Sequence, residues 1–123
     1  MKRLLAALML LVALPLAAQE RILAYDSTVE IRADGSLDVT EHITVRAEGN
    51  QIRRGIYRDF PTIYRAWHGR AVAPFEVRSV KRNGAEEPWH IQEQPNGVRL
   101  YIGRADRNLP RGLHRYEIRY RTD

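Results

Sequence analysis

One stretch of the sequence decides the fold class: Leu37-Asp-Val-Thr-Glu-His-Ile-Thr-Val45. Its odd positions carry Leu, Val, Glu, Ile and Val, whereas every even position is polar. Alternation with a period of two predicts a β-strand that buries one face. The preceding segment shows the same period, because Val29 and Ile31 stand between polar residues. We therefore expect two neighbouring strands that form a hairpin.

The loop between these strands sets the register of the hairpin. A two-residue loop, Asp34-Gly35, would place Arg32 opposite Leu37 and so set a charge on the apolar face. A three-residue loop, Ala33-Asp-Gly35, instead pairs Ile31 with Leu37 and puts the glycine last, where a left-handed residue is required. We predict the three-residue loop.

The same alternation continues to the end of the chain. Its apolar positions are Phe75 and Val77, then Val98, Leu100 and Ile102, and finally Tyr116, Ile118 and Tyr120. Asn83-Gly84 is typical of a two-residue hairpin turn, which sets Lys81 opposite Glu86. Six or seven strands joined by Gly, Asn and Pro turns, with no convincing helical stretch after the first residues, predict an all-β fold. We expect an antiparallel β-sandwich, for which the immunoglobulin-like architecture is one arrangement.

Residues 1–18 have the composition of a secretory signal peptide. A basic start, Met1-Lys-Arg3, precedes the apolar run Leu4–Leu16, and the small pair Ala17-Ala18 follows. The apolar run is about 13 residues long, short of the roughly 20 that a membrane span needs. Leu16 stands where a small residue is preferred before the cleavage site, so a retained N-terminal anchor is the alternative.

Cleavage after Ala18 would leave a single exported domain, residues 19–123, at the periplasmic or extracellular face of the membrane. Loss of Lys2 and Arg3 lowers the formal net charge from +5 to +3. A charge this small does not favour a nucleic-acid partner, and an exported domain would seldom meet one. The chain has no cysteine, which excludes disulfides, thiolate metal sites and cysteine nucleophiles.

Catalytic and metal-binding patterns are missing from the sequence. No two of the four histidines share a short ligand spacing, and there is no Gly-x-Ser-x-Gly or Gly-rich phosphate loop. We predict no catalytic residues, no metal and no cofactor. The histidines, which we expect at solvent-facing or turn positions, are His42, His68, His90 and His114.

Two tryptophans and a stripe of arginines have two interpretations each. Trp67 and Trp89 lie beside turn-like sequence, and we expect them to cover the ends of the core; glycan or peptide binding at exposed rings is the alternative. Outward strand positions hold Arg99, Arg119 and Arg121, which would suit anionic lipid headgroups or anionic envelope polymers. Because acids are interspersed, we expect a mixed solvated face.

The segment Ile52–Phe60 departs from the strand pattern. It places three arginines against a single acid and interleaves them with Ile, Tyr and Phe. Guanidinium groups beside aromatic rings suit carboxylate, phosphate or peptide-backbone partners. The candidate binding residues are Arg53, Arg54, Tyr57, Arg58 and Asp59. In the structural alternative, the apolar residues pin a long connection to the core, and the acid neutralises one arginine.

Two stretches carry a family resemblance: Asp34-Gly-Ser-Leu-Asp-Val-Thr-Glu41 and Ile52-Arg-Arg-Gly-Ile-Tyr-Arg-Asp-Phe-Pro-Thr62. They resemble a bacterial family of membrane proteins known as domain-of-unknown-function family 2207. Asn96–Gly103 and Tyr116–Thr122 are similar to its later strands. The resemblance implies a signal peptide, an extracytoplasmic β-rich domain and then transmembrane helices, so that segments beyond residue 123 would hold the protein in the membrane. It implies no catalytic residues.

The sequence therefore predicts a non-enzymatic, extracytoplasmic binding, sensing or assembly module of an integral membrane protein. Its partner would be an envelope protein, an anionic glycan or a lipid headgroup. A purely structural domain that supports a membrane-embedded partner is the first alternative, and a cell-envelope enzyme is the second.

Overall fold

The computed structural model describes residues 21–50, 52–67 and 69–123, which form β-strands and no helix. The signal peptide predicted at 1–18 lies outside the described residues, and so does His68. No helix of the length and hydropathy that a membrane span requires occurs in the described part of the chain. The strands are β1 (Arg21–Ile31), β2 (Leu37–Ala47), β3 (Gly55–Pro61), β4 (Ile63–Ala66), β5 (Gly69–Val72), β6 (Phe75–Arg82), β7 (Ala85–Glu86), β8 (Trp89–Gln94), β9 (Gly97–Gly103) and β10 (Gly112–Thr122).

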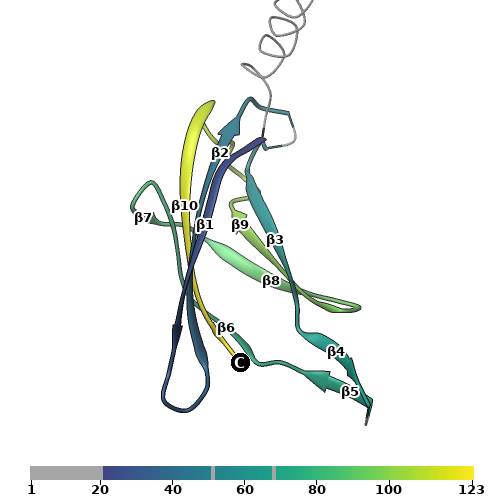
Figure 1. The fold of residues 1–123 in the computed structure, drawn as a ribbon. Helices are drawn as coiled ribbons and strands as arrows, with labels where there is room; N and C mark the ends of the chain where they lie inside the picture. The colour runs from purple at the N-terminus through teal and green to yellow at the C-terminus, as the bar shows by residue number, and fades with distance from the viewer. Residues whose placement is uncertain (1–20, 51, 68) are drawn as a thin grey trace, which may run out of the picture.

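Two antiparallel sheets pack face to face (Figure 1). The larger sheet has five strands in the order β1-β2-β10-β6-β7, and the smaller has three in the order β3-β9-β8. A separate hairpin, β4-β5, projects away from both sheets. The predicted antiparallel β-sandwich is therefore confirmed. Its strand order is not that of an immunoglobulin domain, because the last strand, β10, lies inside the larger sheet between β2 and β6.

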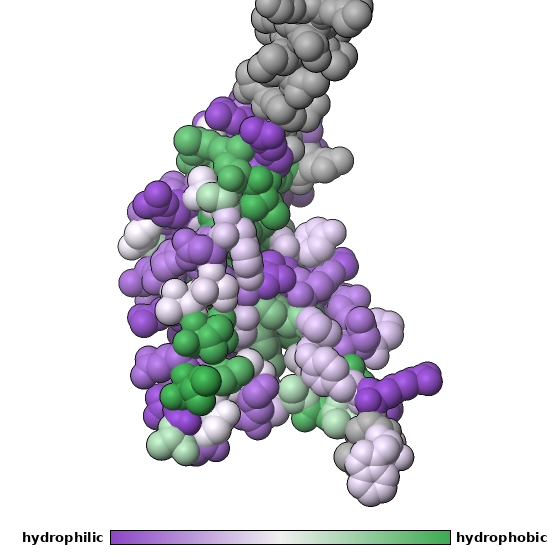
Figure 2. All heavy atoms as spheres, viewed as in Figure 1, coloured by the Kyte–Doolittle hydropathy of each residue, from purple (hydrophilic) through white to green (hydrophobic). Residues whose placement is uncertain are grey.

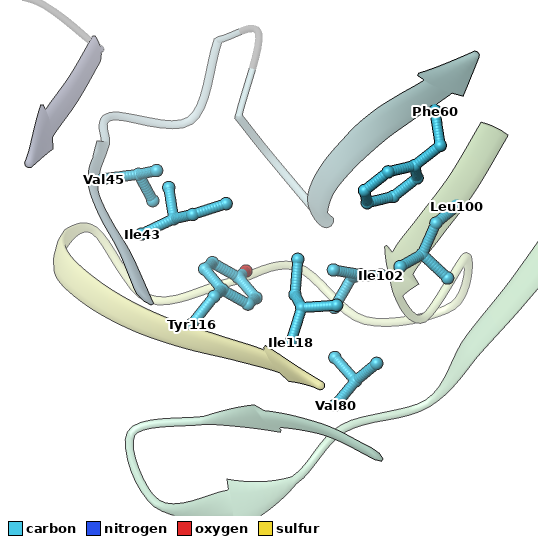
Figure 3. Packing of buried hydrophobic residues seen from close by; sticks show 8 residues of the cluster. All are labelled: Ile43, Val45, Phe60, Val80, Leu100, Ile102, Tyr116 and Ile118. Atoms are coloured by element: carbon cyan, nitrogen blue, oxygen red, sulfur yellow. The ribbon is translucent and has the colours of Figure 1, made fainter. Parts of the chain in front are cut away.

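The core lies between the facing sides of the two sheets (Figure 3). The larger sheet contributes Ile43, Val45, Val80, Tyr116 and Ile118, and the smaller contributes Phe60, Leu100 and Ile102. Full burial of an apolar side chain of this size stabilises a fold by roughly 1.5–3 kcal/mol. These contacts hold the smaller sheet against the larger, and they determine which residues of β3 and β9 face the core.

The first hairpin has the predicted register. Ile31 pairs with Leu37, and the Arg32 backbone N–H donates to the Ser36 carbonyl oxygen at 2.8 Å, which closes the three-residue loop. Gly35 ends this loop with φ 89°, in the left-handed region where a side chain would be strained. The prediction from turn chemistry is confirmed.

The second predicted register is confirmed as well. Lys81 pairs with Glu86 across the turn between β6 and β7. The turn residues Asn83 and Gly84 have φ values of 53° and 84°, and positive φ at both central positions defines a type I′ turn.

The expectation that both tryptophans cover the core is wrong. Trp67 is 96% exposed, because it follows β4 in the hairpin that projects away from the two large sheets. Trp89 is 41% exposed. It pairs with the buried Ile102 and so faces the side of the core, but β8 is an end strand of the smaller sheet and is exposed along most of its length. Exposure here depends on what covers a strand, which local sequence does not record.

The expectation of a solvent-facing or turn position is wrong for His114. This residue is 4% exposed, because β10 directs it to the same side as Tyr116 and Ile118. Its Nε2 lies 2.6 Å from the Pro110 carbonyl oxygen, which can only accept a hydrogen bond, and its Nδ1 lies 3.2 Å from Arg82 Nη1, which can only donate one. The contact between His114 and Arg82 links β10 to β6.

Candidate binding site on the smaller sheet

The five predicted binding residues do not form one cluster. Arg53 and Arg54 precede β3, and the strand itself then alternates. Arg58 shares its side of β3 with the buried Phe60, whereas Tyr57 and Asp59 point to the outer face of the smaller sheet. A period of two thus separates neighbours in sequence onto opposite sides of the sheet.

Arg58 forms an ion pair with Glu41 inside the sandwich. Glu41 lies on β2 among apolar neighbours and is 1% exposed. Arg58 Nε donates to Glu41 Oε1 at 2.9 Å, and Nη2 donates to Oε2 at 2.6 Å. This two-point pairing joins the smaller sheet to the larger one. A buried carboxylate without such a partner would be strongly destabilising, so the role of Arg58 is architectural.

Two tyrosine hydroxyls complete the surroundings of the Glu41 carboxylate. The hydroxyls of Tyr25 and Tyr120 donate to Oε2 at 3.0 Å and 2.9 Å. Burial raises the pKa of Tyr120, and the hydrogen bond to Glu41 raises it further; the same two causes raise the pKa of Tyr25. The Arg58 guanidinium also has a raised pKa, because the bonds and charge of Glu41 outweigh the opposing effect of its own burial. All three donors therefore keep their protons at neutral pH.

Sequence reasoning missed this network, although two signals pointed to it. Glu41 falls on the apolar side of its alternating strand, and a carboxylate there requires a cationic partner. Arg58 lies two residues from both Ile56 and Phe60, which places it on the same, inward side of its strand. That these two positions meet depends on how the sheets pack, which neither strand specifies alone.

The outer face of the smaller sheet carries a row of aromatic rings. Tyr57, Tyr101 and His90 are register partners across β3, β9 and β8. His90 stacks on Tyr101 with ring centroids 4.9 Å apart, and Tyr57 lies 6.0 Å from Tyr101. The guanidinium of Arg99 lies over Tyr57 at 4.3 Å from the ring centroid, which is a cation–π contact.

Asp59 belongs to this outer face through its pairing with Arg99. Arg99 Nε and Nη2 donate to the two carboxylate oxygens at 2.7 Å and 3.0 Å. These bonds lower the pKa of Asp59 and raise the pKa of Arg99. Because both charges are used in the pair, Asp59 neutralises Arg99 and none of the three arginines of the predicted loop.

A cavity of about 320 Å³ opens beside the aromatic row. It is lined by residues 53–57, His90 and residues 101–105. Two facing glycines, Gly55 and Gly103, form part of the lining without side chains. A Cβ atom on Gly103 would lie 2.1 Å from the Arg54 carbonyl oxygen, so no larger residue fits there. We call this site the Arg53–Arg54 cavity.

The cavity has two guanidinium groups without an acidic partner among the described residues. Arg53 and Arg54 are exposed, and neither lies within ion-pair distance of a carboxylate in the described part of the chain. The third cation, Arg104, is held by Asp106 through bonds of 3.0 Å and 3.1 Å. Two available cations beside tyrosine and histidine rings are suited to an anionic group attached to a ring or an apolar chain.

The described residues contain no group of three His, Asp or Glu side chains placed to hold a metal ion.

The cavity residues that sequence reasoning missed are Tyr101, His90 and Arg104. They reach the cavity through the pairing of β9 with both β3 and β8, which joins segments far apart in the chain. The facing glycines were the available signal, since each ends or begins an otherwise regular strand.

Residues 21–123 match the family described as "Predicted membrane protein (DUF2207) N-terminal domain". The chain belongs to this family. It is 33% identical over 105 residues to the uncharacterized protein YciQ of Escherichia coli (strain K12). That match covers 85% of this chain and 17% of the relative, so the chain spans about a sixth of the relative's length. Membership of DUF2207 associates the chain with a membrane protein and assigns no residue a role.

Two solved structures of yeast leukotriene A4 hydrolase share the fold of the DUF2207 chain. Native yeast LTA4 hydrolase matches with a TM-score of 0.59 at 14% identity, over 83% of this chain and 14% of that one. Native leukotriene A4 hydrolase from Saccharomyces cerevisiae matches with a TM-score of 0.59 at 16% identity, over 83% of this chain and 15% of that one. At this level of identity the likeness concerns the fold alone.

Proposed function

We propose that the DUF2207 chain is a non-enzymatic, extracytoplasmic binding module of an integral membrane protein, and that its ligand is an anionic group held in the Arg53–Arg54 cavity. The observation that carries the proposal is the pair of guanidinium groups without an acidic partner at the rim of an aromatic-walled cavity. A structural role explains Arg58, whose charge is used by Glu41, but it leaves Arg53 and Arg54 without a partner in the described residues.

The ligand chemistry is a carboxylate or phosphate next to a ring or an apolar chain. Anionic glycans and lipid headgroups both supply it, and so does an acidic segment of an envelope protein. Each charge-assisted hydrogen bond contributes roughly 1.5–3 kcal/mol, and 1.4 kcal/mol corresponds to tenfold in affinity. Loss of either arginine should therefore weaken binding about tenfold or more.

Calorimetric titration of the purified full-length protein tests the proposal. One arm uses a uronic-acid disaccharide, another uses glycerol phosphate, and a third uses an acidic peptide. The double variant Arg53→Gln, Arg54→Gln is compared with Arg70→Gln, Arg119→Gln, which removes the same charge from exposed positions outside the cavity.

We expect one probe to bind the parent and the control variant, and to lose about 100-fold or more in affinity on the double cavity variant, with unfolding midpoints unchanged. Equal losses in both variants would indicate general charge attraction and contradict the site. Unfolding of the cavity variant alone would favour the second candidate function, a structural domain that supports a membrane-embedded partner.

The extracytoplasmic location is part of the same proposal. Residues 1–18 resemble a signal peptide, and DUF2207 is a family of predicted membrane proteins. We propose that the N-terminal segment exports the domain and that polypeptide beyond residue 123 anchors it. N-terminal sequencing of the protein from the envelope should give a start at Gln19, and an intact N-terminus would contradict cleavage.

A further inference from the structure

The inner face of β1 is left open by the smaller sheet. Tyr25, Val29 and Ile31 pair with residues of β2 that face the core, yet they are 52%, 52% and 75% exposed. The smaller sheet has three strands against five, so it does not reach the end of the larger one. Figure 2 shows apolar side chains gathered near both ends of β1. This strand therefore has an apolar surface on the side that elsewhere is core.

Tyr25 and Val29 of that surface line a groove of about 380 Å³, and Ile31 lies further along the same face of β1. The opposite wall consists of β3 and the start of β4, and the end of β10 lies in the groove, because Thr122 and Asp123 are among its lining residues. The cation in the lining, Arg58, is already bonded to Glu41. An anionic ligand is therefore not suited to this groove, whereas an apolar segment is.

Both walls end in strands that lack a second neighbour. β1 pairs with β2 and β3 pairs with β9, and each is the end strand of its sheet among the described residues. An end strand presents a row of backbone N–H and C=O groups that can pair with an added strand. An extended peptide satisfies such groups and buries alternate side chains in the same step.

The position of Asp123 and the length of the relatives indicate which segment fills the groove. The chain matches a domain described as N-terminal and covers 17% of YciQ, so a protein of that length continues far beyond this domain. A segment tethered at the groove itself has an effective concentration in the millimolar range, which a second copy lacks. We propose that the polypeptide following Asp123 in the full-length DUF2207 protein returns through this groove as an extended segment and covers the inner face of β1.

Site-specific photo-crosslinking in the full-length protein tests this proposal. p-Benzoyl-phenylalanine replaces Val29 in one variant and Ile31 in a second, and both sites are exposed, so the core is not disturbed. The control replaces Thr28, which is also exposed but lies on the opposite face of β1. After irradiation in the membrane, mass spectrometry of the digested protein identifies the partner of each crosslink.

We expect crosslinks from positions 29 and 31, but not from position 28, to peptides of the same chain that lie beyond residue 123. A product of twice the chain mass from positions 29 and 31 would identify a second copy and overturn the proposal. Crosslinks to a different protein, or no crosslink from either position, would overturn it as well.

Discussion

The ion pair between Arg58 and Glu41 makes a quantitative prediction about stability. Removing one partner of a fully buried pair costs about 3–5 kcal/mol, because a charge is left without compensation. The Arg58 side chain is 29% exposed, whereas the Glu41 side chain is 2% exposed. Water can therefore reach the Glu41 carboxylate once Arg58 is truncated, and we expect Arg58→Ala to lower the free energy of unfolding by about 2–4 kcal/mol.

Urea unfolding of the chain without residues 1–18 measures this cost. The matched control is Asp59→Ala, which breaks the exposed pair with Arg99 and should cost much less than Arg58→Ala, because water screens an exposed ion pair. The double variant Glu41→Leu, Arg58→Met leaves no buried charge, and it should be more stable than Arg58→Ala. A cost for Arg58→Ala no larger than that of Asp59→Ala would refute the assignment of Arg58 to the architecture.

Four further substitutions are expected to alter stability, and unfolding experiments measure the effect of each. Tyr116→Phe should raise the free energy of unfolding by about 1 kcal/mol, because the buried hydroxyl of Tyr116 has no hydrogen-bond partner among the described residues. Tyr120→Phe should lower the free energy of unfolding by about 1.5–3 kcal/mol, because it removes a hydrogen bond to the Glu41 carboxylate. Hydrogen bonds from Arg121 and Arg32 lower the pKa of Asp38 from 3.8 to about 2. The ionised Asp38 carboxylate therefore stabilises the fold fully above about pH 4, and this contribution is lost as the pH falls to about 2. Asp38→Asn should reduce this acid dependence of the free energy of unfolding. Gly103→Ala should destabilise more than Gly84→Ala, since both glycines have positive φ but only the former Cβ would meet backbone atoms.

The strands and hairpin registers were predictable because they depend on local chemistry. Side-chain direction alternates along any strand, and Gly35 and the Asn83-Gly84 pair specify their turns. The central position of β10 in the larger sheet was not predictable, because the residues of β10 do not by themselves specify β2 and β6 as its neighbouring strands. The prediction that Trp67 covers the core was wrong for the same reason, because the exposure of this side chain depends on whether another segment packs over the hairpin.

In the candidate site, too, the features that depend on local sequence were predictable and those that depend on strand pairing were not. Sequence reasoning found the arginines and Tyr57, because their composition departs from that of an ordinary strand. It did not separate Arg58 from Arg53 and Arg54, because the spacing of Arg58 from Ile56 and Phe60 indicates an inward side chain only once β3 is known to begin at Gly55. His90 and Tyr101 join the site through pairing between strands that are distant in sequence.

The most direct test of the central claim is an NMR titration of the labelled chain with the anionic probe that binds best. We predict that the largest shifts arise at the rings of His90, Tyr101 and Tyr57 and at the guanidinium groups of Arg53 and Arg54, with little change at Trp67. Shifts spread over the exposed arginines of both sheets, or confined to residues outside the cavity, would contradict the claim that the Arg53–Arg54 cavity is the binding site.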